Sequence, residues 1–189
     1  MTTLRPLFLS ALLFVCSQSA SAALIDGFES GDFSANSWST YGAADWSIDS
    51  STAASGIYSA RSGRITHNQS SYLELELATS AGTVSFDYRV SSEDNFDYLM
   101  FYINDIRVFL ITGDTGWLNY SREVIAGTHV FTWRYRKDSS VNSYLDTVWI
   151  DNFSAPLQDV SNVPVPATAW LFAIGLAGVA GLSGLRKKA

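Results

Sequence analysis

The sequence predicts an all-β domain, built as a two-sheet antiparallel sandwich and flanked by two apolar segments. Polarity alternates with a period of two through the middle of the chain, and turn-forming residues recur between the alternating segments. No amphipathic helix of useful length precedes the second apolar segment, so strands alternating with helices are not expected. We therefore expect one β-sandwich domain over residues 23–156.

The alternation is clearest in Tyr72–Leu77, where the leucines share one face and the glutamates share the other. Residues 98–103 and 107–111 flank Asn104-Asp105, which predicts a hairpin. Further strands are expected at 84–90, 118–124, 128–136 and 147–153. Turns are expected at Ala81-Gly82, Gly113-Asp114, Ala126-Gly127 and 137–140.

Composition limits the size and the partners of this domain. The chain has 189 residues, of which 47% are hydrophobic and 14% aromatic, enough for one domain with a core. Its formal net charge of −6 argues against a nucleic-acid partner, because phosphate binding needs a clustered basic face. The glycines form no phosphate-cradling pattern, so we expect no nucleotide partner.

The first apolar segment has the pattern of a signal peptide. Arg5 precedes an apolar run over residues 7–15, and Ala20-Ser21-Ala22 forms a small-residue cleavage site, which predicts a signal peptide over residues 1–22. Cys16 is the only cysteine and would be removed with this peptide. The exported domain would then have no disulfide to stabilise it.

The second apolar segment has the length of a transmembrane helix. Residues 167–185 carry no charge, and a helix of this length reaches about 28 Å, close to the hydrocarbon thickness of a bilayer. The basic cluster Arg186, Lys187 and Lys188 should stay cytoplasmic, so the sandwich would face outward. Residues 157–163 form a short polar linker before this tail.

Residues 164–189 resemble the PEP-CTERM sorting tail, which exosortase enzymes handle in Gram-negative bacteria. The resemblance is carried by Pro164 and Pro166 before the apolar helix and by the terminal basic cluster. Val165 departs from the family, which has glutamate between the prolines. The resemblance implies an exosortase partner and an inner-membrane anchor, followed by display on the cell surface or in the extracellular matrix. The alternative is a plain single-pass tail.

The domain itself resembles the jelly-roll sandwiches of MAM domains and bacterial adhesin modules, a concanavalin-like arrangement. The resemblance is carried by the order of several short motifs: residues 26–31 with Trp38, Asp45-Trp46, residues 55–60, residues 127–133 and residues 148–153. It implies a structural calcium ion held by Glu29, Asp45 and Asp151, with Asp26 as a further ligand. The alternative is that these carboxylates belong to turns and accept hydrogen bonds from backbone amides.

Paired carboxylates raise the question of catalysis. Glu74 and Glu76 lie two residues apart on one predicted strand, about 6.6 Å, which approaches the spacing of glycoside hydrolases. The leucines between them already explain the alternation, because acids must face water if the leucines face the core. His67 and His129, the only histidines, lie in no catalytic motif. We therefore expect a protein that is not an enzyme.

Exposed aromatic rings are the predicted ligand-binding residues, because sugar rings stack on them. Phe131, Trp133 and Tyr135 share one face of a strand and should be core. Trp117 follows a loop-like segment and is the best candidate for exposure. Further candidates in the same half of the domain are Tyr98, Tyr102 and Tyr120.

Together these features predict an exported surface or matrix protein that binds carbohydrate, such as the extracellular polysaccharide of a biofilm. The alternatives are a structural or adhesive module that binds another protein and, less favoured, a glycan hydrolase. Fold alone does not separate these functions.

Overall fold

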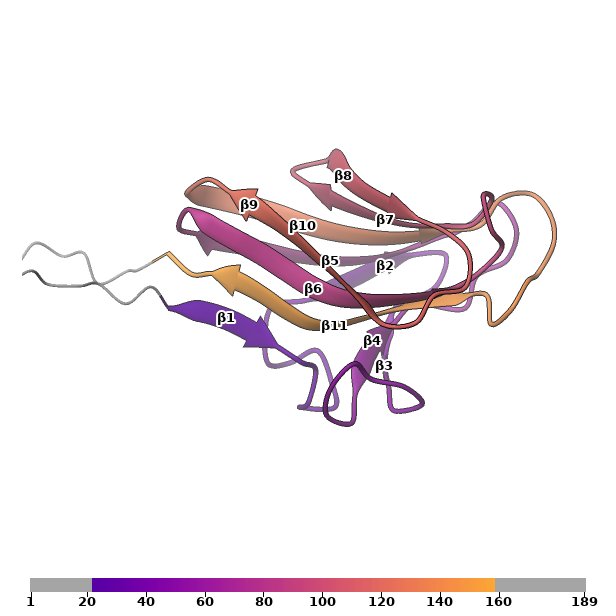
Figure 1. Cartoon of the computed structure of the whole chain (residues 1–189), viewed down its shortest axis with the longest axis horizontal. Helices are drawn as coiled ribbons and strands as arrows, with labels where there is room; N and C mark the ends of the chain where they lie inside the picture. The colour runs from indigo at the N-terminus through magenta and orange to yellow at the C-terminus, as the bar shows by residue number, and fades with distance from the viewer. Residues whose placement is uncertain (1–21, 159–189) are drawn as a thin grey trace, which may run out of the picture.

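The computed structural model describes residues 22–158, and every regular element in that range is a β-strand. Eleven strands form two antiparallel sheets that pack face to face, which confirms the predicted all-β sandwich (Figure 1). Within residues 22–158, no helix has the length and apolarity needed to cross a membrane. The predicted sorting tail, and the predicted signal peptide except for its last residue, lie outside the described residues.

The first sheet is organised around β11 (Thr147–Pro156), the last strand of the domain. β11 pairs along one edge with β6 (Gly82–Ser91), which in turn pairs with β9 (Leu118–Val124). Its other edge is shared by β4 (Ser59–Arg61), next to β3 (Ser47–Asp49), and by β1 (Ala23–Asp26). β11 therefore holds together segments from both ends of the domain.

The second sheet has the order β2-β5-β10-β7-β8. Its strands are β2 (Ser39–Gly42), β5 (Ser70–Thr79), β7 (Tyr98–Ile103), β8 (Ile106–Ile111) and β10 (Gly127–Arg136). Each pair of neighbours is antiparallel. The described chain enters and leaves the sandwich at the same end, because Ala23 of β1 lies opposite Pro156 of β11 (Figure 1).

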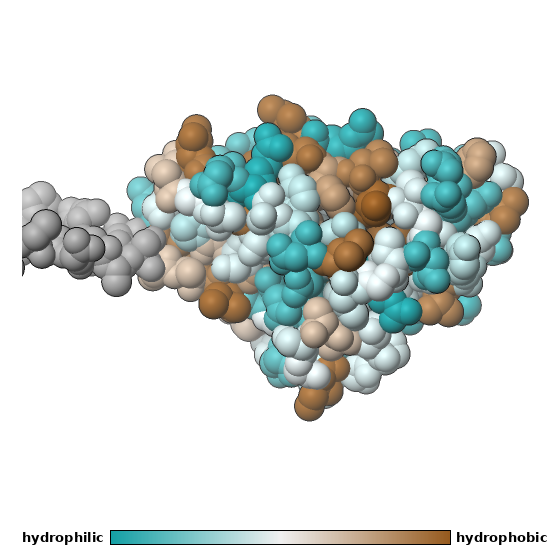
Figure 2. Space-filling view, viewed as in Figure 1, coloured by the Kyte–Doolittle hydropathy of each residue, from teal (hydrophilic) through white to brown (hydrophobic). Residues whose placement is uncertain are grey.

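The core between the sheets is built largely from aromatic rings. Phe131, Trp133 and Tyr135 on the inner face of β10 are fully buried, as the alternation predicts. Trp133 packs against Phe86 and Phe153 of the opposite sheet, with ring centroids 5.3 Å apart in both pairs. On the face drawn in Figure 2, the apolar residues outside the core lie mostly scattered among polar ones.

The observed strands agree closely with the alternation. β7 and β9 have the predicted bounds, and Asn104 and Asp105 adopt φ values of 51° and 63°, as a tight two-residue hairpin turn requires. The four short strands β1 to β4 were not predicted, because three or four residues are too few to show alternation. β11 continues beyond the predicted end at Phe153, since pairing with β1 extends it.

A buried ion pair fixes the long loop between β10 and β11. Lys137 is fully buried, and its Nζ lies 2.8 Å from Asp97 Oδ2 and 2.5 Å from Asp146 Oδ1. Burial lowers the pKa of Lys137, but the hydrogen bonds and charges of Asp146 and Asp97 outweigh it and raise that pKa above its ordinary value. Lys137 therefore stays charged and joins the loop to β7.

Replacing Lys137 with methionine should lower the free energy of unfolding by about 3–5 kcal/mol, because Asp97 would be left buried without a counter-charge. Urea unfolding followed by circular dichroism measures this loss. The double variant Lys137→Met with Asp97→Asn should recover part of it. The control Arg136→Gln, at an exposed position on β10, should stay within about 0.5 kcal/mol of the natural chain. Equal stability of Lys137→Met and the natural chain would contradict this role.

Candidate functional site

A layered stack of side chains crosses the outer face of the second sheet. Tyr41 of β2 stacks on Tyr72 of β5, with ring centroids 4.7 Å apart and an interplanar angle of 6°. The guanidinium of Arg134 on β10 lies 5.4 Å from the centroid of the Tyr72 ring. The strand register explains this order, since Tyr41 lies opposite Tyr72 and Tyr72 lies opposite Arg134. The leucines between them face the core, so these side chains must face outward.

Hydrogen bonds hold the stack in place. Arg134 Nε and Nη2 donate to Ser70 Oγ over 3.1 and 2.9 Å. The Tyr41 hydroxyl and the Thr132 hydroxyl both donate to Glu74 Oε2, over 2.9 and 3.2 Å. Burial, followed by the hydrogen bond and charge of Glu74, raises the pKa of Tyr41 to about 12, so its hydroxyl stays protonated at neutral pH.

The stack borders a shallow hollow of about 140 Å³ on this face. Its lining combines three aromatic rings with a carboxylate, a hydroxyl and a guanidinium: Tyr41, Tyr72, Tyr102, Asp105, Thr132 and Arg134. Tyr102 joins the hollow because it lies opposite Thr132 on the neighbouring strand β7. Tyr41 and Arg134 cover the two faces of the Tyr72 ring, so the apolar surface left for a ligand comes from Tyr41 and Tyr102. Such rings beside hydrogen-bonding groups suit a ligand that has both apolar C–H faces and hydroxyls.

Of the four predicted ligand-binding aromatics, the structure places Tyr102 at the hollow. Tyr98 lies on the same outer face of β7, and its hydroxyl donates to the Asn95 carbonyl. Trp117 is half-buried rather than exposed, and its indole N–H donates to Thr52 Oγ1 over 3.1 Å. Tyr120 points into the sandwich, where its ring lies 5.3 Å from that of Phe86. The four residues therefore do not form one surface.

The sequence prediction did not include Tyr41, Tyr72 and Arg134, although they form the stack. A signal was present for two of them, since Tyr72 shares a face with Glu74 and Arg134 alternates with the buried aromatics of β10. Tyr41 gave none, because its strand has only four residues. The three come together through pairing between distant strands, which alternation does not reveal.

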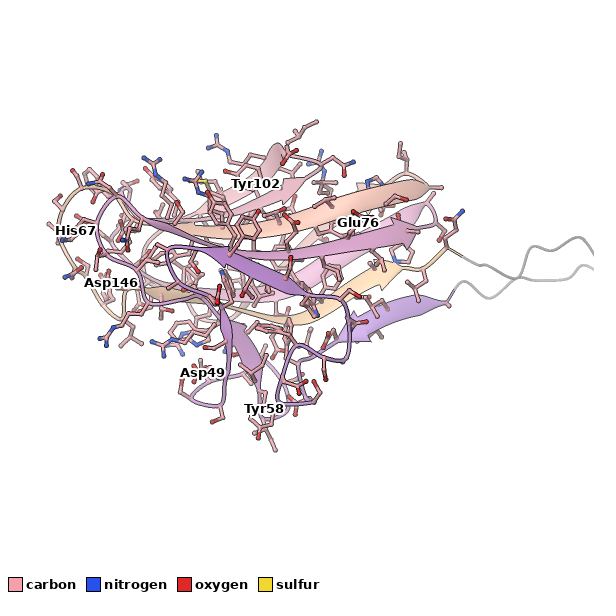
Figure 3. All side chains as sticks on the ribbon, turned by 180° about the vertical axis from the view of Figure 1, so that it is seen from behind. Asp49, Tyr58, His67, Glu76, Tyr102 and Asp146 are labelled. Atoms are coloured by element: carbon pink, nitrogen blue, oxygen red, sulfur yellow. The ribbon has the colours of Figure 1, made fainter. Side chains whose placement is uncertain are left out.

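The two glutamates of β5 project from one face, as the alternation predicts. Glu74 is half-buried and contacts Tyr41 and Thr132 at the hollow. Glu76 is exposed, lies opposite Val130 and does not line the hollow. The two glutamates therefore do not converge on a common site. In Figure 3, Glu76 lies nearer than Tyr102 to the end of the sandwich where the chain enters and leaves.

Three of the four predicted calcium ligands accept hydrogen bonds that fasten loops. Asp26 is buried and accepts from the Phe28 amide and from the Asn36 and Trp38 side chains. Glu29 accepts from the backbone amides of residues 57 and 58. Asp151 is fully buried and accepts from the amides of residues 54, 55 and 152.

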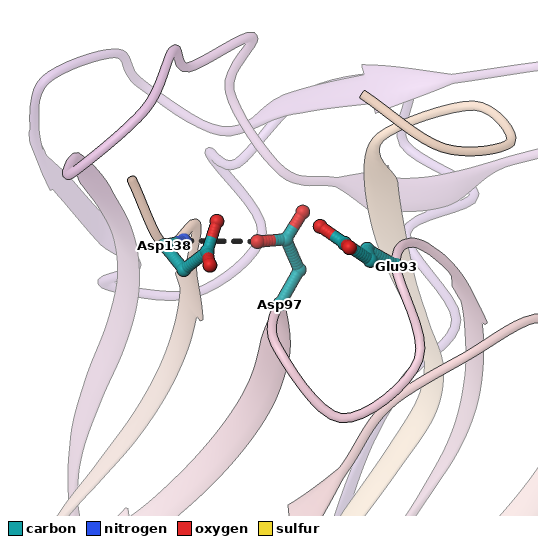
Figure 4. Close-up of side chains that lie close together, drawn as sticks. All are labelled: Glu93, Asp97 and Asp138. Carbon is teal, nitrogen blue, oxygen red and sulfur yellow. Dashed lines mark hydrogen bonds between the residues drawn. The ribbon is translucent and has the colours of Figure 1, made fainter. Parts of the chain in front are cut away.

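The fourth predicted ligand, Asp45, is exposed, and the four carboxylates do not gather as a metal-binding group. Within residues 22–158, the single group of three acidic side chains with oxygens inside 4.8 Å of one another is Glu93, Asp97 and Asp138 (Figure 4). Asp97 Oδ1 accepts the Asp138 amide over 2.9 Å, and Asp97 Oδ2 binds Lys137. Burial and then the charges of Asp138 and Asp97 raise the pKa of Glu93. Both oxygens of Asp97 therefore already have partners within the domain, the Asp138 amide and the Lys137 ammonium group.

Comparison with known proteins shows the fold. No family model matches the chain, and no curated protein matches it. Several solved structures share its fold with TM-scores above 0.5. TmCBM61, solved in complex with β-1,4-galactotriose, is 21% identical with a TM-score of 0.51, over 69% of this chain and 94% of that chain.

Two adhesin domains of Lys-gingipain share the same fold. The K2 domain is 20% identical with a TM-score of 0.54, over 72% of this chain and all of that chain. The K1 domain, from Porphyromonas gingivalis W83, is 16% identical with a TM-score of 0.54, over 72% of this chain and 99% of that chain. Carbohydrate-binding and adhesin sandwiches are therefore the fold relatives of this domain.

The calcium ion implied by the sequence resemblance stays a prediction. If calcium binds at Asp151 and Glu29, adding it should raise the midpoint of thermal unfolding, EDTA should reverse the rise, and Asp151→Asn should abolish the difference. Calorimetry of the full chain with calcium and with EDTA measures this. Equal midpoints in both would contradict the prediction and leave the binding of loop amides as the role of these carboxylates.

Proposed function

We propose that this domain is a non-enzymatic carbohydrate-binding module whose ligand lies in the hollow beside Tyr41, Tyr72 and Tyr102. One observation carries the proposal: a stack of two tyrosines and an arginine borders a hollow that is also lined by a third tyrosine, a hydroxyl and a carboxylate. A sugar presents apolar C–H faces to aromatic rings and hydroxyls to polar groups, so both halves of the lining would be used.

Fixed polar groups would orient the sugar. Asp105 is exposed at the hairpin turn between β7 and β8 and would accept sugar hydroxyls. Arg134 already donates to Ser70, so its remaining N–H groups would donate outward. Because hydrogen bonds to Ser70 hold Arg134 before the ligand arrives, this side chain would lose little entropy on binding.

The comparisons support two functions of different kinds. TmCBM61, a fold relative, was solved with a bound galactotriose, which supports sugar binding by a sandwich of this type. The adhesin domains of Lys-gingipain support the second candidate, a structural or adhesive module, which would attach to another protein. We favour sugar binding, because the hollow on the second sheet is small, polar and lined by aromatic rings.

Hydrolysis is the least supported function. Glu74 and Glu76 lie on one strand, but Glu74 accepts hydrogen bonds from Tyr41 and Thr132 and Glu76 lies outside the hollow. A retaining or inverting hydrolase needs two carboxyl groups on opposite sides of one bond. Glycan cleavage that disappears in Glu74→Gln would be required to establish an enzyme.

We further propose that the domain acts outside the cell. Its predicted signal peptide would export it, and the tail over residues 164–189 would anchor it in the inner membrane and deliver it to an exosortase. The extracellular polysaccharide would then be the ligand within reach. The basic cluster at Arg186, Lys187 and Lys188 would remain on the cytoplasmic side.

Replacing Tyr102 with alanine should weaken glycan binding at least about fivefold, because a stacked ring contributes roughly 1–3 kcal/mol. A glycan array of the full-length protein first identifies the sugar, and isothermal titration then measures the affinity. The matched control is Tyr98→Phe on the same face of β7, which keeps the ring and should bind normally. Unchanged affinity in both Tyr102→Ala and Tyr72→Ala would contradict the hollow as the site.

Cell fractionation should recover the tagged chain from the membrane, the cell surface or the medium. The recovered chain should be shorter than the translated sequence. The size change reports removal of residues 1–22, and a second, smaller product would report processing near Pro164. Replacing Arg5 with glutamate should retain the precursor inside the cell. Full-length protein in the cytosol of the unaltered strain would contradict export.

A further inference from the structure

A second pocket, of about 380 Å³, lies apart from the hollow. Its lining comes from β4 and the segment after it, and from the loop that precedes β11. Figure 3 shows Asp146, one of the lining residues, at the end of the sandwich away from the termini, whereas Tyr102 lies over the sheet. The two sites share no lining residue. Its volume is within the range of about 300–1,000 Å³ that is typical of small-molecule sites.

One wall of this pocket presents a guanidinium held in a fixed position. Arg61 Nε donates to Thr147 Oγ1 over 3.3 Å, and Thr147 Oγ1 is in turn 2.9 Å from Ser62 Oγ. The guanidinium of Arg61 also lies 5.7 Å from the centroid of the Trp149 ring. Its two terminal nitrogens make no hydrogen bond within residues 22–158. They therefore form a free fork of donors, the geometry that pairs with a carboxylate.

A second guanidinium belongs to the same pocket. Arg64 lines it, is exposed, and makes no hydrogen bond or ion pair within the described part of the chain. The single acid in the lining is Asp146, whose Oδ1 is bound by Lys137 Nζ over 2.5 Å and by the Ser143 amide over 3.3 Å. The pocket lining therefore contains two arginines without an ion-pair partner among residues 22–158 and one carboxylate, Asp146, whose charge is partly neutralised by Lys137. The lining has two positive side chains and one negative one, although the whole chain carries a net charge of −6. Burial acts to raise the pKa of Asp49, but hydrogen bonds and the charge of nearby Arg61 lower it.

Two further lining residues are apolar side chains on the loop before β11, which Lys137 fastens. Tyr144 and Leu145 are 68% and 60% exposed and line the pocket. Tyr144 and Asp146 adopt φ values of 58° and 49°, an uncommon conformation for residues other than glycine, and the Lys137–Asp146 bond holds this part of the loop in shape. The tyrosine ring offers a face on which a sugar ring can stack.

From this arrangement we propose that the pocket binds an acidic sugar, with its carboxylate on Arg61 and Arg64 and its ring against Tyr144. A simple anion would use the arginines alone and leave the tyrosine ring bare. A neutral sugar would leave both guanidinium groups without partners. An acidic sugar uses both the arginines and the ring, and its binding does not depend on the hollow of the second sheet.

The experiment compares two matched trisaccharides, one of galacturonic acid and one of galactose with the same linkage, titrated into the full-length protein by calorimetry. The natural chain should bind the acidic trimer at least about tenfold more tightly than the neutral one at about 50 mM salt, because charge-assisted bonds are about twice as strong as neutral ones. Raising the salt to about 500 mM should reduce this preference.

Two substitutions locate the effect. Arg64→Gln should weaken binding of the acidic trimer about tenfold and leave the fold intact, because Arg64 is exposed and contacts nothing that its loss would unpair. The single variant Tyr144→Ala should also weaken binding of the acidic trimer, because the sugar ring would lose the aromatic face on which it stacks. Arg122→Gln, at an exposed arginine on β9, is the matched control for loss of one positive charge and should bind normally.

Equal affinity for the two trimers, or normal binding of the acidic trimer by Arg64→Gln, would overturn the proposal. Loss of acidic binding in Tyr102→Ala but not in Arg64→Gln would also overturn it, since the hollow would then be the site, and the proposed function would stand. Acidic binding that survives Tyr102→Ala and is lost in Arg64→Gln supports the pocket, even if the hollow binds no neutral glycan. Free acetate that binds as tightly as the acidic trimer would show a simple anion site and reject the sugar.

Discussion

The buried carboxylate of Asp151 is the interaction on which the rest of the sandwich depends. It lies at the bulge of β11, fully buried, and accepts N–H groups from Ala54, Ser55 and Asn152. Burial is the largest influence on its pKa and raises it, while the three amides favour the charged form. Asn152 adopts a φ of 49° there, and its side chain donates to Asp87 of β6. Asp151 and Asn152 together thus join the last strand, its neighbour and a distant loop, without a disulfide.

This linkage explains why the outer faces of the two sheets differ. Asp151 binds the amides of residues 54 and 55, and Thr52 lies two residues before them. The Thr52 hydroxyl accepts hydrogen bonds from Arg89 and Trp117 on the outer face of the first sheet. Trp149 points outward from β11 but is only 2% exposed, because Arg61 and Arg89 lie over its ring. The second sheet keeps a hollow on its outer face, lined by aromatic side chains of β2, β5 and β7. The proposed sugar site lies on that sheet for this reason.

Charged groups perform in this domain the work that disulfides perform in many small extracellular domains. Asp26 fastens the segment after β1, Asp151 fastens the segment before β4, and Lys137 fastens the loop before β11. The sequence suggested a metal ion for two of these carboxylates. Amide and indole N–H groups donate to these carboxylates in the structure. The loop that Lys137 holds carries Tyr144, the aromatic residue of the second pocket. Rigidity and binding therefore draw on the same buried charges.

By itself the sequence determined the strands from β5 to β11 and the buried faces of β5 and β10, because side chains alternate across a strand whatever its neighbours are. It also determined the hairpin at Asn104 and the aromatic layer that includes Trp133. The tertiary structure decided which outward side chains meet. Tyr41 stacks on Tyr72, and Trp117 donates a hydrogen bond to Thr52, through contacts between segments far apart in the chain. Alternation carries no information on which strands are neighbours, since that depends on how both sheets pack as a whole.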